Sequence, residues 1–435
     1  MLPAVAPSTD AEPDPALGVD LPFSIEPGMA VELGGSFYAT ALRHESHGSR
    51  ALLARLSRDA AAPLAAVIEL TRLDGDVPPP RLAVDGDELL VAVEDAIGGA
   101  YRVRMARLSA AALSAVVPGG AGPQLDWHEG PHPSRDESNA YDFAAGQGLA
   151  LFAWDDWPKG ESHGRVYALG VTREGSASAP VALSGAEVDA EEPRLVPRPG
   201  GYWLTWLVAT TAAARERVYD PGERGPSSAP ATGGRGGRAV VARDEGAGGA
   251  RLPLTGGTPY GARGIEIVAL DAAGKPAGTV RRIRTDAARV VGYDLTTSAA
   301  GNAWLVWRQD APSPGAAGGR VFMAEVQSDG PRASLLVREE DVGSGAPSWL
   351  GAGAPSGLGV ALPVASGSAG RWLTFPDQRD RTLLLPIEAP LSPPEPLSLA
   401  TNLQGAAALT AAAGQLLFAW PRGRALELFT AECQR

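Results

Sequence analysis

The feature that most constrains the fold of this chain is a phrase that recurs along almost its whole length. A short apolar run, a turn containing glycine and an alternating run that ends in tryptophan occur together in four clear copies, at 141–156, 193–208, 293–310 and 405–423. Weaker copies lie at 28–43, 80–95 and 359–377. Self-similarity of this kind indicates an architecture built from one repeated supersecondary unit.

A second recurring phrase follows each copy after a gap of variable length. It reads as a strand, a short polar turn with glycine or proline, and another strand, as in 164–184 and 264–283. Each unit therefore holds four strands, and no helical periodicity accompanies them. Seven such units predict an all-β fold, a seven-bladed β-propeller with four-stranded blades. The predicted blades are 27–72, 80–118, 140–185, 193–285, 291–338, 357–400 and 405–432.

The seventh unit lacks an outer strand. The apolar stretch 18–26 is predicted to supply it, which would close the last blade with the N-terminal strand and leave no unpaired sheet edge there. Residues 18–435 are thus predicted to form one domain, preceded by a flexible acidic Pro/Ala tether at 1–17. A Gly-, Arg- and Ala-rich insertion at 211–262 interrupts the fourth blade and is predicted to be disordered.

Composition limits the partners of this chain. Its 435 residues carry a formal net charge of −12, which argues against a general nucleic-acid binder. Cys433 is the single cysteine, so no internal disulfide and no thiolate metal cage is expected. No stretch is apolar enough over a sufficient length to span a bilayer. We expect a monomer without a cofactor, and the acidic Pro/Ala start slightly favours an extracytoplasmic location over a cytoplasmic one.

The connections between the predicted strands are uneven. With strands lettered A to D from the channel outwards, the A–B and C–D turns are short and alike. The B–C and D–A connections share the other face and are long and dissimilar, as at 119–139, 209–263, 309–319 and 339–356. Long, variable loops on a uniform scaffold are where binding residues concentrate, so we expect the functional site on this long-loop face.

All five histidines are predicted to lie on the long-loop face, two of them at His44 and His47 in the first B–C loop. The motif His128-Glu129-Gly130-Pro131-His132 matches H-E-x-x-H, but the glycine and proline forbid the helix on which that zinc motif depends. A metal site built from loops is the remaining metal hypothesis, and solvated polar loops are its alternative. The residues concerned are His128, His132 and His163, with Asp136, Asp155, Asp156 and Glu161 as oxygen ligands and Trp157 beside them.

Charged residues recur at one position of the predicted innermost strands. Arg81, Asp142, Arg194 and Asp294 occupy this position in blades two to five, the last with an offset of one residue. Alternating charges in successive blades would form a partial ring at the channel mouth. This ring would anchor a polar or charged ligand, or it would pair neighbouring blades and set their registry.

The repeated phrases, such as those at 149–156 and 164–184, resemble degenerate propellers among uncharacterised secreted or lipoprotein-like proteins of high-GC bacteria. This resemblance implies a fold and no particular activity. The sequence lacks the sialidase box, the WD40 and kelch signatures, the quinoprotein docking motif, G-x-S-x-G, the P-loop and the Rossmann fingerprint. No catalytic residue is therefore carried over from those families.

The leading hypothesis is a non-catalytic binding or scaffold propeller that engages a protein or a glycan through the long-loop face. An alternative is a carbohydrate-active hydrolase or lyase with an acid pair drawn from Asp142, Asp294, Asp155 and Asp156. The loop-built metal site is a second alternative.

Overall fold

The computed structural model arranges most of the chain in antiparallel β-sheets. Among the residues it describes, six sheets have four strands and one has three. The described residues are 25–45, 48–57, 64–75, 77–97, 100–116, 122–134, 140–158, 161, 163–210, 263–283, 289–298, 300–310, 319–327, 330–337, 364–367, 370–376, 382–386, 397–398, 408–412, 415–422 and 425–432.

Each sheet takes consecutive strands of the chain in order. The first sheet consists of β1 (Ile25–Leu33), β2 (Ser36–Glu45), β3 (Gly48–Ser57) and β4 (Leu64–Leu73). The second consists of β5 (Arg81–Asp85), β6 (Glu88–Ile97), β7 (Ala100–Ser109) and β8 (Trp127–Glu129). The third consists of β9 (Tyr141–Gly146), β10 (Leu149–Asp156), β11 (Arg165–Thr172) and β12 (Val181–Ala182). The next two are β13 (Val188–Arg198), β14 (Gly201–Thr210), β15 (Arg263–Asp271) and β16 (Arg281–Ile283); and β17 (Arg289–Thr297), β18 (Ala303–Asp310), β19 (Gly319–Gln327) and β20 (Gly330–Val337). The last two are β21 (Val364–Gly367), β22 (Gly370–Pro376), β23 (Thr382–Pro386) and β24 (Leu397–Ser398); and β25 (Ala408–Ala412), β26 (Gln415–Arg422) and β27 (Ala425–Glu432).

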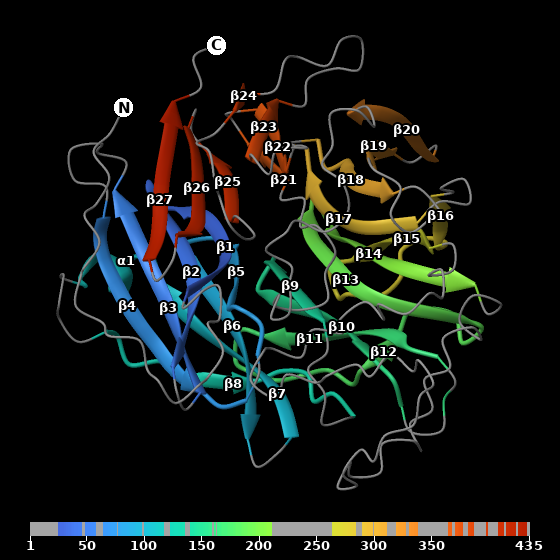
Figure 1. Ribbon diagram of the computed structural model, residues 1–435. Coiled ribbons are helices and arrows are strands. Elements are labelled where there is room, and N and C mark those ends of the chain that lie inside the picture. The colour runs from blue at the N-terminus through green and yellow to red at the C-terminus, as the bar shows by residue number, and fades with distance from the viewer. Residues whose placement is uncertain are drawn as a thin grey trace, which may run out of the picture.

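The sheets stand around a common centre (Figure 1). The first strands of successive sheets contact one another in the order β1, β5, β9, β13, β17, β21 and β25, and β25 contacts β1 in turn. The prediction of an all-β propeller is confirmed. Of the segment 18–26, only Ile25 and Glu26 are described, and they pair with Arg43 and Leu42 of β2 rather than with the last sheet. The insertion 211–262 lies outside the described residues.

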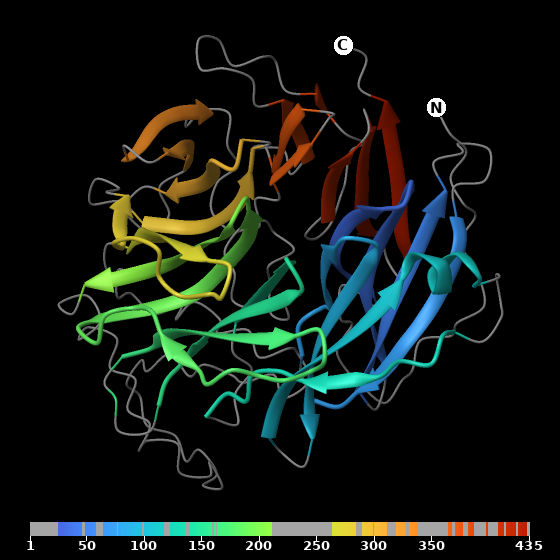
Figure 2. The ribbon, with the colours of Figure 1, turned by 180° about the vertical axis from the view of Figure 1, so that it is seen from behind.

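The second sheet differs from the prediction in its outer part. The predicted second blade, 80–118, would end in its outer strand, but Ala110–Ser114 form the short helix α1 (Figure 2). Three consecutive alanines favour a helix, and the Ser109 hydroxyl caps it by accepting a hydrogen bond from the Ala112 N–H at 3.1 Å. The outer strand is instead β8, which pairs with β7.

Three tryptophans of the repeated phrase lie within the second strands of their sheets and in the core. Trp154, Trp206 and Trp307 are all buried, and each packs against the preceding sheet as well as its own. The rings of Trp154 and Tyr167 stack with centroids 5.7 Å apart. These side chains act as wedges that hold neighbouring sheets together.

Each sheet has two ends with different connections. Because the strands are antiparallel and pair in chain order, successive connections lie alternately at one end of the sheet and at the other. The turn from β9 to β10 consists of Gln147 and Gly148, with φ of 57° and 81°. Two central residues at positive φ make a tight hairpin turn, which suits the right-handed twist of the strands. The first strands therefore begin, and the second strands end, at the long-loop face.

Candidate functional site

Four charged residues on the first strands lie at one level of the ring. In the strand pairing, Arg81 lies opposite Ala92, Asp142 opposite Ala153, Arg194 opposite Thr205 and Asp294 opposite Val306. In the last three pairs, the partner directly precedes the buried tryptophan of its strand. Four adjacent sheets thus carry alternating charges at equivalent positions, without the predicted offset. We call Arg81, Asp142, Arg194 and Asp294 the charged arc, and the end of the ring where it lies the channel mouth.

Arg194 is the electrostatic centre of the charged arc. Its guanidinium carbon lies 5.7 Å from the centroid of the Tyr293 ring. Burial would lower the pKa of Arg194, but Tyr293, Asp142, Asp294 and Glu192 together raise it above the ordinary value. Carboxylates from both neighbouring sheets therefore stabilise one guanidinium, and Arg194 stays charged.

The two carboxylate oxygens of Asp142 differ in their hydrogen bonding. Its side chain is buried, with 5% exposed. The Oδ2 atom accepts a hydrogen bond of 2.8 Å from the N–H of Leu195 on the next sheet. The Oδ1 atom is buried and has no hydrogen-bond partner among the described residues. Buried polar atoms are normally satisfied, so this oxygen is a candidate acceptor for a water molecule or for a ligand.

The other end of the charged arc reaches the first sheet. The Nε2 atom of His44 lies 3.5 Å from Oε2 of Glu26. Burial raises the pKa of Glu26, while His44 and Arg81 act to lower it. Burial also raises the pKa of the Tyr141 phenol, whose hydroxyl donates to the Ala92 carbonyl at 3.3 Å. The polar region thus continues from β17 to β1.

Glu192 belongs to this region, although the sequence reading did not identify it. The predicted fourth blade began at residue 193, whereas β13 begins at Val188. The pairing with β14 shifts between Glu191 and Arg194, which is a β-bulge, and Glu192 there has a φ of +56°. In the sequence, only the charged residues on either side of Pro193 (Glu191, Glu192 and Arg194) indicated a polar position here.

The environment of Glu192 favours its neutral form. Burial raises the pKa of Glu192 to about 7, and the charges of Glu191 and Asp155 act in the same direction. Arg263 and Arg194 oppose this shift without cancelling it. The carboxyl group therefore gains and loses its proton close to neutral pH.

The predicted loop-face carboxylates line a small cleft between the third and fourth sheets. The cleft is shallow and has room for little more than a water-sized group. Its lining residues are Asp155, Asp156, Trp157, Gly164, Asp189, Ala190 and Glu191.

The carboxylates of this cleft hold the connections of the fold. Asp155 Oδ1 accepts from the Ala140 N–H at 2.9 Å, and Asp156 accepts from the N–H and the hydroxyl of Ser134 at 3.1 and 2.7 Å. Asp189 accepts from the Gly164 N–H at 3.0 Å. The Glu191 carboxylate lies 2.8 Å from the guanidinium of Arg263. These contacts favour a structural role, in which the loop backbone is fixed by side-chain acceptors.

The predicted loop histidines that are described lie on different elements. His44 lies in β2 rather than in the first B–C loop, which corrects its predicted place. His128 lies in the outer strand β8 rather than in a loop, so that expectation was wrong; a Cβ atom on Gly175 would lie 2.4 Å from its Nδ1. His132 Nε2 lies 3.3 Å from Oε2 of Glu129, and the Nδ1 atom of His163 is buried without a hydrogen-bond partner in the described part of the chain.

The hypothesis of a loop-built metal site gains no support from the described residues. They contain no group of three or more histidine, cysteine, aspartate or glutamate side chains that could hold a metal ion. The strand conformation of Trp127–Glu129 also removes the helix that H-E-x-x-H requires. His47 and Asp136 lie outside the described residues.

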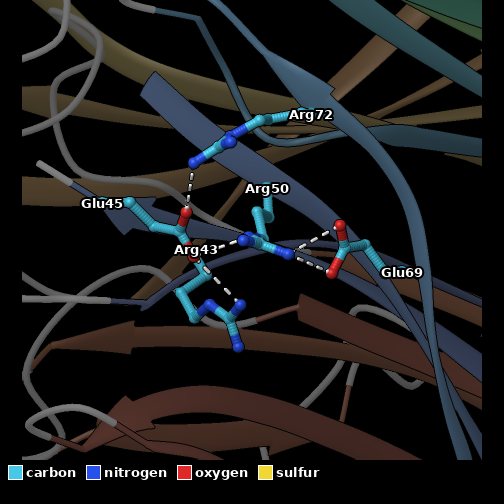
Figure 3. A network of polar contacts seen from close by, with 5 residues as sticks. All are labelled: Arg43, Glu45, Arg50, Glu69 and Arg72. Carbon is cyan, nitrogen blue, oxygen red and sulfur yellow. Dashed lines mark hydrogen bonds and ion pairs between the residues drawn. The ribbon is translucent and has the colours of Figure 1, made fainter. Parts of the chain in front are cut away.

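A separate network of charges ties together β2, β3 and β4 of the first sheet (Figure 3). Glu45 is at its centre, 3.0 Å from Arg43, 2.7 Å from Arg50 and 3.2 Å from Arg72. Arg50 also lies 2.6 Å from Glu69. The hydrogen bond to Arg50, followed by that to Arg43, lowers the pKa of Glu45. Because these side chains are partly exposed, we assign the network to strand registry rather than to ligand binding.

No protein-family model matches this sequence. No curated protein matches it either. No helix within the described ranges has the length and apolarity needed to cross a membrane.

Solved structures of similar fold cover most of the chain. The polysaccharide lyase Uly1 matches with a TM-score of 0.51 and 10% identity over 93% of this chain and 90% of its own. A puromycin-hydrolyzing peptidase of Mycobacterium tuberculosis gives 0.52 and 13% over 97% of this chain, which spans about half (53%) of that peptidase. The β-propeller domain of the Trilobed protease from Pyrococcus furiosus gives 0.47 and 8%, with coverages of 94% and 96%. At these identities the likeness extends to the fold alone.

Proposed function

We propose that this protein is a glycan-binding propeller that holds a neutral saccharide at the channel mouth. The observation that carries the proposal is the buried Oδ1 atom of Asp142, which has no hydrogen-bond partner among the described residues. A carboxylate oxygen is a strong acceptor, and a sugar hydroxyl is a donor that would satisfy it. The fold is compatible with such a ligand, since a polysaccharide lyase has the same fold.

The mixture of charges at the channel mouth favours a neutral, polyhydroxylated ligand. Asp142 and Asp294 supply acceptors for hydroxyl groups, and the guanidinium groups of Arg81 and Arg194 supply donors. A polyanionic glycan fits less well, because the whole chain carries a net charge of −12 and would repel it.

The test is binding of neutral hexasaccharides to the wild type and to Asp142→Asn. The substitution keeps an acceptor for the Leu195 N–H and replaces the unpartnered oxygen with an NH₂ donor. We expect at least tenfold weaker binding by calorimetry, since a charged acceptor is replaced by a donor. Asp87→Asn is the matched control, because Asp87 is exposed in the β5–β6 turn at the opposite end of the sheets.

Cellohexaose, xylohexaose, mannohexaose and arabinohexaose form the panel. Failure of the wild type to bind any of them would refute the glycan proposal and favour a protein-binding scaffold. Equal affinities for wild type and Asp142→Asn would show that the channel mouth is not the binding site.

A carbohydrate-active hydrolase or lyase is the second candidate, and the same observation favours it. Of the four acids that the sequence nominated, Asp155 and Asp156 each accept two hydrogen bonds from protein groups. Asp142 retains a carboxylate oxygen that could act on a substrate or a water molecule. Turnover of any panel member would distinguish this candidate from simple binding.

A further inference from the structure

One face of the first sheet is covered by its neighbour only in part. Ala39 of β2 pairs with Ala54 of β3, and Ala54 pairs with Val67 of β4, so these three residues share one face. Ala39 and Ala54 are buried in one cluster with Leu417 of the last sheet, whereas Val67 is 50% exposed. We call this face, from β2 to its exposed outer strand β4, the open face.

The open face lies where the last sheet has fewer strands than its neighbours. Among the described residues the last sheet has three strands and every other sheet has four. The opposite face of β4 shows what a fourth strand does. There Trp127 of β8, the fourth strand of the second sheet, packs against the cluster that contains Ile68. The open face has no such cover from the part of the chain that the structure describes.

The network around Glu45 occupies the open face (Figure 3). Arg43 pairs with Arg50, and Arg50 pairs with Arg72, four positions along β2 and β3 from the alanine pair, so these arginines share its face. Their side chains are 42%, 29% and 59% exposed. Three guanidinium groups meet only the carboxylates of Glu45 and Glu69 in this network, which leaves one positive charge in excess. An open face with this charge attracts an acidic segment.

The segment that precedes β1 has the charge and the starting point to reach the open face. Residues 1–24, which lie outside the described residues, contain no lysine or arginine and four acidic residues, Asp10, Glu12, Asp14 and Asp20. β1 begins at Ile25, which pairs with Arg43, so this segment joins the sheet beside the first arginine of the network. Strands lie about 4.8 Å apart, so β4 is about 14 Å from β1, a span of about five extended residues.

We propose that the acidic segment Asp10–Asp20 of this chain docks on the open face of the first sheet, with its carboxylates against Arg43, Arg50 and Arg72. A second copy of the chain or an acidic partner protein would compete for the same surface. The chain's own segment has the advantage of attachment beside Arg43, which gives it an effective concentration on the order of millimolar.

The first test measures the mobility of the segment in the full chain. A fluorophore on Leu17→Cys, in a Cys433→Ser background, reports nanosecond motion through the decay of its anisotropy. We expect a small fast component at low salt and an increase of about threefold in 1 M NaCl, because salt screens the charge pairs. The neutralised segment should be released without added salt, and it leaves the arginines unchanged. Its substitutions are Asp10→Asn, Glu12→Gln, Asp14→Asn and Asp20→Asn.

The second test removes charge from the open face. Arg43→Gln and Arg72→Gln are combined, since both side chains are largely exposed, and the fast component should again increase about threefold. Arg102→Gln is the matched control, because Arg102 lies on the third strand of the neighbouring second sheet, opposite Asp95. The control should leave the segment as restricted as in the wild type.

The outcomes decide between the possible occupants. A segment that is mobile in the wild type at low salt would overturn the proposal, and so would a restricted segment that the neutralising substitutions do not release. A restriction that is lost on dilution, together with dissociation of a dimer in sedimentation velocity, would assign the open face to a second copy instead. Urea denaturation checks the folding of the arginine variant, and if that variant does not fold, the neutralised segment decides the outcome.

Discussion

The ionisation of Glu192 predicts a pH dependence of stability that needs no ligand. The folded protein has a pKa of about 7 at this residue, against an ordinary value of 4.5. Because the folded pKa is raised, the native state holds this proton more tightly than the unfolded state between these two pH values. The free energy of unfolding should therefore be largest below pH 4.5, as far as this group is concerned, and should decline as the pH rises through 7.

The size of the effect follows from the shift. Each pKa unit corresponds to about 1.4 kcal/mol, so the shift amounts to at most about 3 kcal/mol between pH 4.5 and pH 8. Glu192→Gln is always neutral and removes this contribution. We expect the variant to match the wild type at pH 4.5 and to be more stable by up to about 3 kcal/mol at pH 8.

Urea denaturation followed by tryptophan fluorescence, at pH values from 4.5 to 8.5, measures both proteins. Buried Trp154, Trp206 and Trp307 report on the core throughout. The contributions of the other titrating groups to the free energy of unfolding cancel, because only the difference between variant and wild type is used. Glu187→Gln makes the same chemical change at an exposed position just before β13, and it should give a difference that does not vary with pH. A constant difference for Glu192→Gln as well would refute the raised pKa and the desolvation that causes it.

Three further predictions concern the contacts that hold the fold. Trp206→Ala should lower the free energy of unfolding by about 3–5 kcal/mol in urea titrations, because the ring is fully buried between two sheets; a loss below about 1 kcal/mol would refute its role as a wedge. Asp156→Ala should cost about 1–3 kcal/mol in the same assay, since both acceptors of Ser134 are lost, and should leave saccharide affinity unchanged. Glu45→Gln should cost less than about 1 kcal/mol at low salt, and the cost should disappear in 1 M NaCl; a loss that persists at high salt would contradict a screened surface network.

The buried scaffold could be predicted in detail. Trp154, Trp206 and Trp307 each lie within a second strand, and all three are in the core. Their positions were readable because alternation along a strand and burial against the next sheet repeat in every unit. The common level of Arg81 and Asp142 on the first strands was readable for the same reason.

The prediction failed where contacts between units override the repeat. Residues 110–117 fitted the period of a strand, yet the cap from Ser109 and the burial of Leu113 made a helix of Ala110–Ser114. His128 was assigned to a loop for the same reason, although it lies in β8, the outer strand of this sheet. Local pattern alone does not separate these cases, since short apolar runs suit either structure.

The sequence by itself determined the class of fold, the buried tryptophans and the level at which charged residues face the channel mouth. All of these depend on periodicity along one strand, which a linear pattern records. Only the tertiary structure decided that Asp142 keeps an unpartnered oxygen and that Glu192 sits at positive φ in a bulge. Hydrogen-bond satisfaction, bulge position and desolvation depend on groups contributed by neighbouring sheets, so no single stretch of sequence encodes them.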